Sequence, residues 1–228
     1  MDTAHESPAR QSRSSLAPTL IYVALFFAVW TLRATVLYRF DTRIGSDLWR
    51  SVYSNVVKFA VWVVPAFVYL LKVDRRDPLR YLKLTTRPEG SKLPFAFAAA
   101  VLYLAATCLF GVYGQGRQVS LSVSGVALAS TSISSLSEEI LFRGFILNKL
   151  REGVGFRAAN LATALLFVAI HLPNWLWTRG FQRAVAFDCL GVFLLACLLG
   201  YLVKETNSLW AGVGLHVANN VLSSVLRP

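Results

Sequence analysis

Charged residues are scarce in this sequence. They make up 15% of its 228 residues, whereas soluble globular domains contain about 25%. Hydrophobic residues reach 55%, and several apolar runs approach the roughly 20 residues that cross a bilayer as a helix. An ordinary soluble domain is therefore excluded. We predict an all-α fold, a polytopic transmembrane bundle of about seven helices with an intramembrane polar cavity.

Acidic residues are particularly few. The chain has 12 Asp and Glu against 23 Lys and Arg, which gives a formal net charge of +11. The basic residues gather beside the apolar runs, a distribution typical of the positive-inside rule and of contacts with anionic headgroups. We therefore expect membrane lipids and no nucleic acid as partners. The same rule predicts that the N-terminus and the basic loop 72–92 are cytoplasmic.

Cysteine is rare as well. Cys108, Cys189 and Cys197 all lie in apolar runs, their number is odd, and their spacing matches no metal-ligand pattern. We interpret all three as small buried apolar side chains and expect neither disulfides nor a cysteine zinc site. The sequence also contains no internal repeat, which argues against a transporter built from repeated halves.

The apolar runs divide the chain into a tail and a membrane domain. Residues 1–17 are polar and Ser-rich, and we predict a disordered tail. It is not a signal peptide, because the apolar run that follows is long enough to stay in the membrane. Residues 18–228 are predicted to form one membrane-embedded domain, with a motif-bearing protease core at 119–226. The expected spans and helical regions lie at about 18–37, 52–71, 93–112, 119–150, 158–171, 184–203 and 208–226.

Prolines mark two expected interruptions. Pro65 is predicted to kink the second span. The sequence Leu172-Pro173-Asn174 is predicted to end the fifth helical region.

Two adjacent carboxylates and an arginine interrupt the fourth region, in the pattern Glu138-Glu139-x-x-x-Arg143. A charge at the centre of a membrane helix costs roughly 2.5–3.5 kcal/mol, so such groups need partners, a wet cavity or a function. Glu139 and Arg143 are four residues apart and share one helix face, where they can pair. Glu138 points about a quarter-turn away and is free for another role.

Two further patterns place polar residues on single helix faces, namely Phe167-x-x-x-His171 and His216-x-x-x-Asn220. Because these groups are costly in hydrocarbon, we expect three helices to bring them together in one recessed, wet cluster. A Glu beside a neutral His can activate water as a general base. A His and an Asn one turn apart can donate hydrogen bonds to a developing oxyanion. The combined set could therefore hydrolyse a peptide bond within the membrane.

Each pattern also has a purely structural interpretation. A buried Glu–Arg pair is more often structural than catalytic, and we assign that role to Glu139 and Arg143. A single buried histidine is usually just hydrogen-bonded, and His216 with Asn220 could hold two helices together. Asp188 has no evident partner in the sequence, and we prefer a structural or cavity-lining role for it. The functional signal comes from all three patterns together, among so few intramembrane polar groups.

The order of the three patterns resembles the CAAX-protease and bacteriocin-processing family of intramembrane endopeptidases, also called the Abi family. The resemblance covers about residues 124–224, and no motif position departs from it. It implies that two residues activate water, Glu138 and His171. It implies an oxyanion hole formed by His216 and Asn220. The supporting positions then fall on Glu139 and Arg143, and Phe167 packs beside the site.

The resemblance leaves the role of a metal open. Glu138, His171 and His216 could ligate zinc, with a water in the fourth position, and the family has often been labelled metalloprotease. Its founding CAAX-processing branch is better described as a glutamate protease without a catalytic metal. The sequence also lacks the compact His-Glu-x-x-His helix of many zinc proteases. We expect no cofactor and keep zinc as the alternative.

The leading hypothesis is an intramembrane endopeptidase, similar to CAAX prenyl proteases, in a bacterial or archaeal cell membrane. Its substrate would be a protein or peptide that is membrane-associated or carries a lipidated cysteine near its C-terminus. A leader-peptide, bacteriocin-related or regulatory membrane substrate is the other expectation. Two non-enzymatic alternatives are a membrane scaffold or bacteriocin-immunity protein with the same fold, and a transporter with Glu138 and Asp188 as proton carriers.

Overall fold

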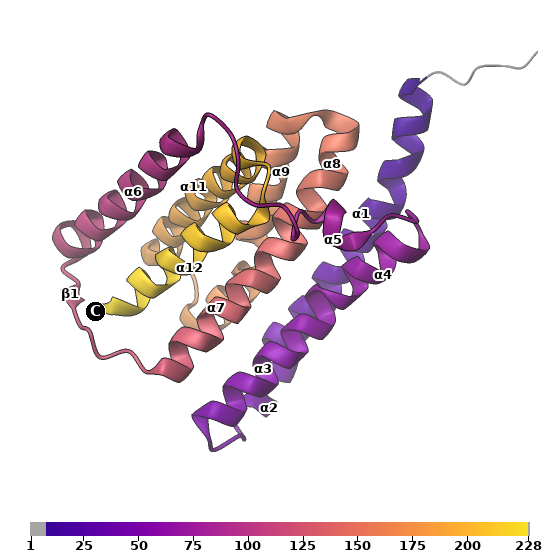
Figure 1. Cartoon of the computed structure of the whole chain (residues 1–228). Coiled ribbons are helices and arrows are strands. Elements are labelled where there is room, and N and C mark those ends of the chain that lie inside the picture. The colour runs from indigo at the N-terminus through magenta and orange to yellow at the C-terminus, as the bar shows by residue number, and fades with distance from the viewer. Residues whose placement is uncertain (1–7, 228) are drawn as a thin grey trace, which may run out of the picture.

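The computed structural model of this chain describes residues 8–227, and helices dominate it (Figure 1). Two short strands, β1 (Gln118–Val119) and β2 (Leu226–Arg227), form a single antiparallel pair. The η segments are π-helical. In chain order the helices are α1 (Pro8–Leu32), η1 (Arg33–Leu37), α2 (Tyr38–Asp41), α3 (Asp47–Trp62), α4 (Val64–Lys72), α5 (Pro78–Tyr81), α6 (Leu93–Leu109), η2 (Phe110–Gly114), α7 (Gly125–Glu139), η3 (Ile140–Ile146), α8 (Leu147–Val154), α9 (Phe156–Ala169), α10 (Leu172–Arg179), α11 (Arg183–Thr206) and α12 (Leu209–Val225).

Among the described residues, five helical segments are long and apolar enough to cross a membrane. Two other expected helices, α7 and α12, are shorter, at 15 and 17 residues, and carry the polar motifs. The predicted all-α polytopic bundle is confirmed, and the chain is an integral membrane protein. The five segments are Leu16–Asp41, Asp47–Lys72, Leu93–Gly114, Phe156–Arg179 and Arg183–Thr206.

Two helix starts differ from the expected ones. α1 begins at Pro8, so the tail predicted to be disordered over residues 1–17 is helical from there on, while residues 1–7 lie outside the described residues. The helix expected from residue 119 begins only at Gly125, because the chain first pairs with β2. Ser124 then caps the helix, with its Oγ accepting from the Ala127 N–H at 3.1 Å.

Both prolines lie close to an interruption of the helical path. α3 ends at Trp62 and α4 begins at Val64, so the second span is interrupted at Val63, next to the kink predicted at Pro65. α9 ends at Ala169, so the fifth helical region stops ahead of Pro173 as predicted, and a separate helix, α10, then begins at Leu172. Proline suits the first turn of a helix, where its missing N–H has no partner to lose. The cysteines are free, and all three are half-buried where full burial was expected.

α7 occupies the centre of the arrangement that forms the site. It packs against α3 on one side and α12 on the other, as Figure 1 shows. α11 packs against α9 and α12 and closes the far side of this group. The helices that carry the three motifs are therefore neighbours, as the polar clustering predicted.

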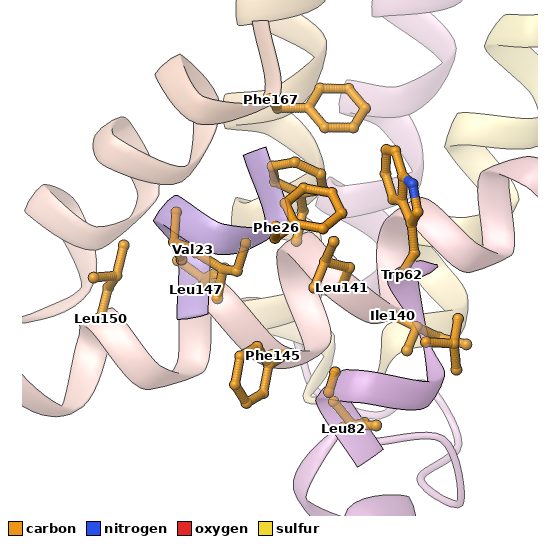
Figure 2. Close-up of a cluster of buried hydrophobic side chains, with 14 of the residues drawn as sticks. Val23, Phe26, Trp62, Leu82, Ile140, Leu141, Phe145, Leu147, Leu150 and Phe167 are labelled. Carbon is orange, nitrogen blue, oxygen red and sulfur yellow. The ribbon is translucent and has the colours of Figure 1, made fainter. Parts of the chain in front are cut away.

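An aromatic core fixes the motif helix relative to the N-terminal half (Figure 2). Phe26 of α1 and Trp62 of α3 have ring centroids 5.2 Å apart, and they lie 6.3 and 5.7 Å from Phe142 of η3. Phe142 meets Phe167 of α9 edge-on at 4.9 Å. Edge-to-face pairs contribute about 0.5–1.5 kcal/mol each beyond their buried area. Three helices, α1, α3 and α9, thus hold η3, and with it the two glutamates that precede it.

Candidate active site

The first motif lies where the helix changes its winding. α7 ends with Glu138 and Glu139, and η3 continues the same helix with π-type hydrogen bonds before α8 begins. Short π segments inside α-helices occur frequently at functional sites. Arg143 reaches back to Glu139, with Nη1 2.8 Å from Oε1, and the two side chains are 1% and 0% exposed. The ion pair expected from the spacing is therefore present.

Glu139 also connects the first motif to the third. Its Oε1 lies 2.8 Å from Nδ1 of His216 on α12. Because a carboxylate oxygen only accepts, Nδ1 carries a proton and donates it, which leaves Nε2 as the free nitrogen. Gly212, one turn earlier, permits this approach, since a Cβ there would lie 3.2 Å from Glu139 Oε2. Glu139 thus pairs with an arginine and orients a histidine at the same time.

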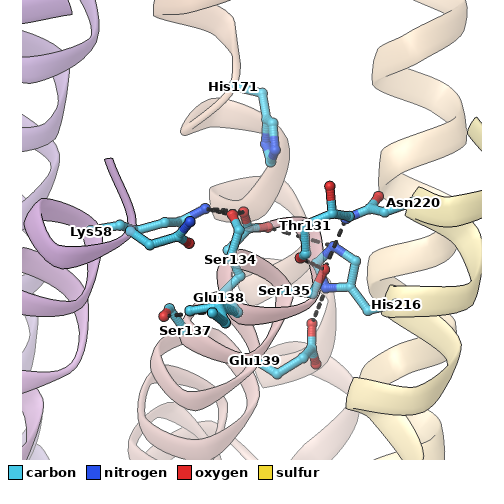
Figure 3. A network of polar contacts seen from close by, with 12 residues as sticks. Lys58, Thr131, Ser134, Ser135, Ser137, Glu138, Glu139, His171, His216 and Asn220 are labelled. Atoms are coloured by element: carbon cyan, nitrogen blue, oxygen red, sulfur yellow. Dashed lines mark hydrogen bonds and ion pairs between the residues drawn. The ribbon is translucent and has the colours of Figure 1, made fainter. Parts of the chain in front are cut away.

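Glu138 faces the free nitrogen of that imidazole. Its Oε2 lies 3.6 Å from His216 Nε2, just beyond direct hydrogen-bond distance. Its Oε1 is bound by Lys58 of α3 and by Ser134, whose Oγ lies 3.3 Å away. Figure 3 shows these contacts. The offset from Glu139 left Glu138 available for a role other than the ion pair with Arg143. In the structure, one of its two oxygens is occupied by Lys58 and Ser134.

His171 comes from the junction between α9 and α10. Its Nδ1 lies 2.7 Å from the carbonyl oxygen of Phe167, so Nδ1–H donates and Nε2 keeps its lone pair. Figure 3 shows the imidazole directed toward the polar network, with no hydrogen bond drawn to it. The ring centroid of Phe167 lies 5.0 Å from that of His171 and 5.7 Å from that of His216. Phe167 therefore packs beside the site, between the two histidines.

Asn220 lies one turn beyond His216 on α12 and is half-buried. Its Nδ2 donates to Ser135 Oγ at 3.0 Å, which ties α12 to α7. The neighbouring Asn219 donates Nδ2 to Asn220 Oδ1 at 3.4 Å and so helps to fix the orientation of the amide. Asn220 and His216 therefore both contact the motif helix, on successive turns of α12.

Lys58 is the residue that sequence reasoning missed. Its Nζ pairs with Glu138 and lies 2.5 Å from Ser134 Oγ. The sequence does contain a clue to its role, because a lysine inside an apolar run is costly in a membrane unless it has a partner. Asp188, whose partner the sequence did not reveal, pairs instead with Arg179 at 2.6 Å. This pair supports the structural role preferred for Asp188.

The possible zinc ligands, Glu138, His171 and His216, have other contacts in the structure. Within residues 8–227, no group of three or more His, Cys, Asp or Glu side chains is arranged to hold a metal ion. Glu138 binds a lysine through Oε1. The contact of His216 Nδ1 with Glu139 is compatible with either role, because zinc-bound histidines also donate their other N–H to a carboxylate. A cation bound to Glu138 also opposes the approach of a divalent ion.

Comparison with known proteins identifies the motif-bearing segment. Residues 119–222 match the family model described as type II CAAX prenyl endopeptidase Rce1-like. No curated protein and no solved structure gives a significant match. The matched range contains all three motifs and lies within the core predicted from them. This segment is therefore similar to the Rce1-like type II CAAX prenyl endopeptidases, a family of protease-type enzymes that act on peptides or proteins.

Proposed function

We propose that this protein is an intramembrane endopeptidase in which Glu138 and His171 activate water. His216 and Asn220 stabilise the oxyanion that forms. One observation carries the proposal, namely the position of His216 between two adjacent glutamates. Glu139 holds one imidazole nitrogen at 2.8 Å, and the other nitrogen faces Glu138 Oε2 at 3.6 Å. A histidine oriented by one carboxylate and facing a second suits proton transfer at a fixed position.

The proposed reaction begins with a water molecule beside Glu138. His171 Nε2 accepts one hydrogen of this water and orients it. The water oxygen attacks the substrate carbonyl carbon, while its other proton passes to Glu138 Oε2 and then to His216 Nε2. The protonated imidazole and the Asn220 amide donate hydrogen bonds to the oxyanion. When the C–N bond breaks, the leaving nitrogen takes the proton from His216, which gives a carboxylic acid, an amine and an ionised Glu138.

A groove between α3 and α7 supports a membrane-associated substrate. It has a volume of about 650 Å³, and its lining is mostly apolar, with Val56 and Phe59 on one helix and Ile133 on the other. The residues next in sequence to Phe59 and Ile133 are Lys58 and Ser134, which both contact Glu138. An apolar peptide segment or a lipid chain fits such a groove, with its peptide bond directed at the polar network. The proposed substrate class is a membrane-associated peptide or protein, including a tail with a lipidated cysteine.

A scaffold or immunity protein is the second candidate. The observation that favours it is the ion pair between Glu138 and Lys58, since a purely structural carboxylate would also be paired with a cation. The transporter alternative has less support. Its second proton carrier, Asp188, is bound to Arg179, so the two acids do not form a shared path.

Comparative proteomics tests the proposal. Membrane and secreted peptides are compared between cells that make the wild type and cells that make Glu138→Gln at matched levels. Glu89→Gln, at an exposed position, is the matched control. We expect a peptide whose new end requires Glu138, which would also identify the substrate. If both variants insert well and no peptide differs, the scaffold candidate is favoured.

The metal-free mechanism has its own test. The purified protein is treated with a zinc chelator and assayed on the Glu138-dependent substrate. Cleavage should continue at the untreated rate. Loss of cleavage that added zinc restores would contradict the proposed mechanism.

A further inference from the structure

A lysine from the N-terminal half completes the polar network. The side chain of Lys58 on α3 is 12% exposed, and its Nζ contacts Glu138 Oε1 and, at 2.5 Å, Ser134 Oγ. The ring centroid of Trp62 lies 4.5 Å from Nζ, and that of Trp30 lies 6.0 Å away. Residues from α1, α3 and α7 therefore surround this ammonium group, and their contacts fix its position.

The charges of the first motif explain why a lysine is needed there. The motif contributes two carboxylates, Glu138 and Glu139, and one guanidinium, Arg143, so its own net charge is −1. Arg143 is paired with Glu139 at 2.8 Å, and Glu138 receives its cation from Lys58. With both histidines neutral, the four buried side chains then sum to zero. An uncompensated carboxylate in this position would be strongly unfavourable.

The lysine also determines which oxygen of Glu138 faces the histidine. Lys58 and Ser134 both donate to Oε1, and Oε2 is the oxygen that lies 3.6 Å from His216 Nε2. The last torsion of a glutamate is broad, so an unbound carboxylate samples many orientations. Two donors on one oxygen narrow this range. A general base must present a lone pair within reach of the proton that it takes, and this arrangement holds Oε2 in one place.

We propose that Lys58 is a positioning residue that holds Oε1 of Glu138 and thereby presents Oε2 to the catalytic water. This inference rests on the proposed function, because it assigns a role within the same site. Lys58 lies outside the matched segment 119–222. The active centre is then composite, with its base in the family segment and the partner that orients the base in the N-terminal half.

Enzyme kinetics on the Glu138-dependent substrate tests this role. Lys58→Met should lower kcat by about 100-fold, the lower end of the range for general-base catalysis, because the base loses its orientation. KM should stay within about threefold, because Lys58 is not placed to bind substrate. Lys58→Arg keeps a cation and should recover at least about tenfold of the lost kcat. Lys72→Met, at an exposed position on the neighbouring α4, is the matched control.

Two results separate this inference from the proposed function. If Glu138→Gln is inactive and Lys58→Met keeps a kcat within about threefold of wild type, the inference is overturned and the function stands. If Glu138→Gln retains wild-type activity, the proposed function is overturned. If Lys58→Met does not fold, Ser134→Ala is used instead, because it removes only the second donor to Glu138 Oε1. It should lower kcat by about three- to tenfold, the range for one hydrogen bond, and an unchanged kcat would refute the positioning role.

A stability measurement tests the pairing without any substrate. Lys58→Met and Glu138→Gln should each lower the Tm, since each leaves the other side chain as an unpaired buried charge. The double variant should recover most of the loss, because both charges are then gone. Simple addition of the two losses would show that the residues do not interact and would overturn the inference.

Discussion

Replacing Arg143 with methionine is expected to destabilise the protein strongly. Methionine keeps an unbranched side chain of similar length but removes the charge. The carboxylate of Glu139, which is 0% exposed, then keeps His216 as its neighbour but loses its cation. Breaking a buried ion pair in this way costs about 3–5 kcal/mol. Arg143 also lies 4.2 Å from the ring centroid of Phe167, so a cation–π contact is lost as well.

The expected loss converts to a clear shift in Tm. For a chain of this length, 1 kcal/mol changes the Tm by about 2–4 °C, so Arg143→Met should lower it by about 6–20 °C. The three free cysteines are half-buried and provide the assay, because a thiol-reactive dye reports their exposure on heating in detergent. All variants are heated at one rate, since unfolding of such proteins is often irreversible.

Two comparison variants make this test specific to the ion pair. Arg151→Met removes an exposed arginine from the adjoining α8 and should change the stability by less than about 0.5 kcal/mol. Arg143→Met combined with Glu139→Gln should regain more than half of the lost Tm, because no unpaired charge remains. A single Arg143→Met variant with wild-type Tm and full activity would refute the reasoning.

The oxyanion side, a helix contact and an ion-paired carboxylate of α8 can be tested in turn. Asn220→Ala should lower kcat by about 10²–10³-fold, as expected for a lost oxyanion donor, with only a small loss of Tm from the broken hydrogen bond to Ser135; a change confined to KM would contradict that role. Gly200→Ala should lower the Tm, because a Cβ there would lie 1.9 Å from Asn160 Oδ1, whereas Gly191→Ala on the same helix meets nothing within 4 Å; equal Tm values for the two variants would contradict this packing. Burial tends to raise the pKa of Glu152, but hydrogen bonds from two neighbouring cations lower it below its ordinary 4.5. Its stabilising contribution is therefore complete above that pH and is lost as the pH falls through the lower folded-state pKa. The Tm should fall on acidification below about pH 4.5, and Glu152→Gln should flatten this dependence; an equally steep fall in the variant would exclude this carboxyl as the cause.

Sequence spacing predicted contacts within one helix but not all contacts between helices. Glu139 and Arg143 pair as their four-residue separation requires. Which carboxylate His216 contacts depends on how α12 packs against α7, and no periodicity along the chain specifies that. Glu139, assigned from the sequence to Arg143 alone, therefore also orients the histidine. The residues of the site were predictable because each is costly in a membrane, whereas the partners that satisfy them were not.

Three other features of the structure could not be predicted from the sequence, for similar physical reasons. A lysine in the first third of a span can snorkel to the surface as readily as it can form a buried pair, so Lys58 remained unassigned. Pro173 is compatible with a helix start as well as a helix end, so the start of α10 was not specified by the sequence. The π-helical winding of η3 has no residue signature in the sequence. Composition and hydropathy were sufficient to predict the fold class, because long apolar runs indicate helices that are surrounded by lipid.

The Lys58–Glu138 pair has a consequence for how the protein is made. Its two residues are 80 positions apart, so α3 is synthesised long before α7. Until α7 arrives, an unpaired lysine within a helix in the bilayer costs up to roughly 2.5–3.5 kcal/mol, the value for the helix centre. Trp30 and Trp62 are made early enough to offset part of this cost, by about 0.5–2 kcal/mol through cation–π contacts. α3 therefore gains the ionic partner of Lys58 only when α7 inserts, which links the stability of the two halves of the chain during synthesis.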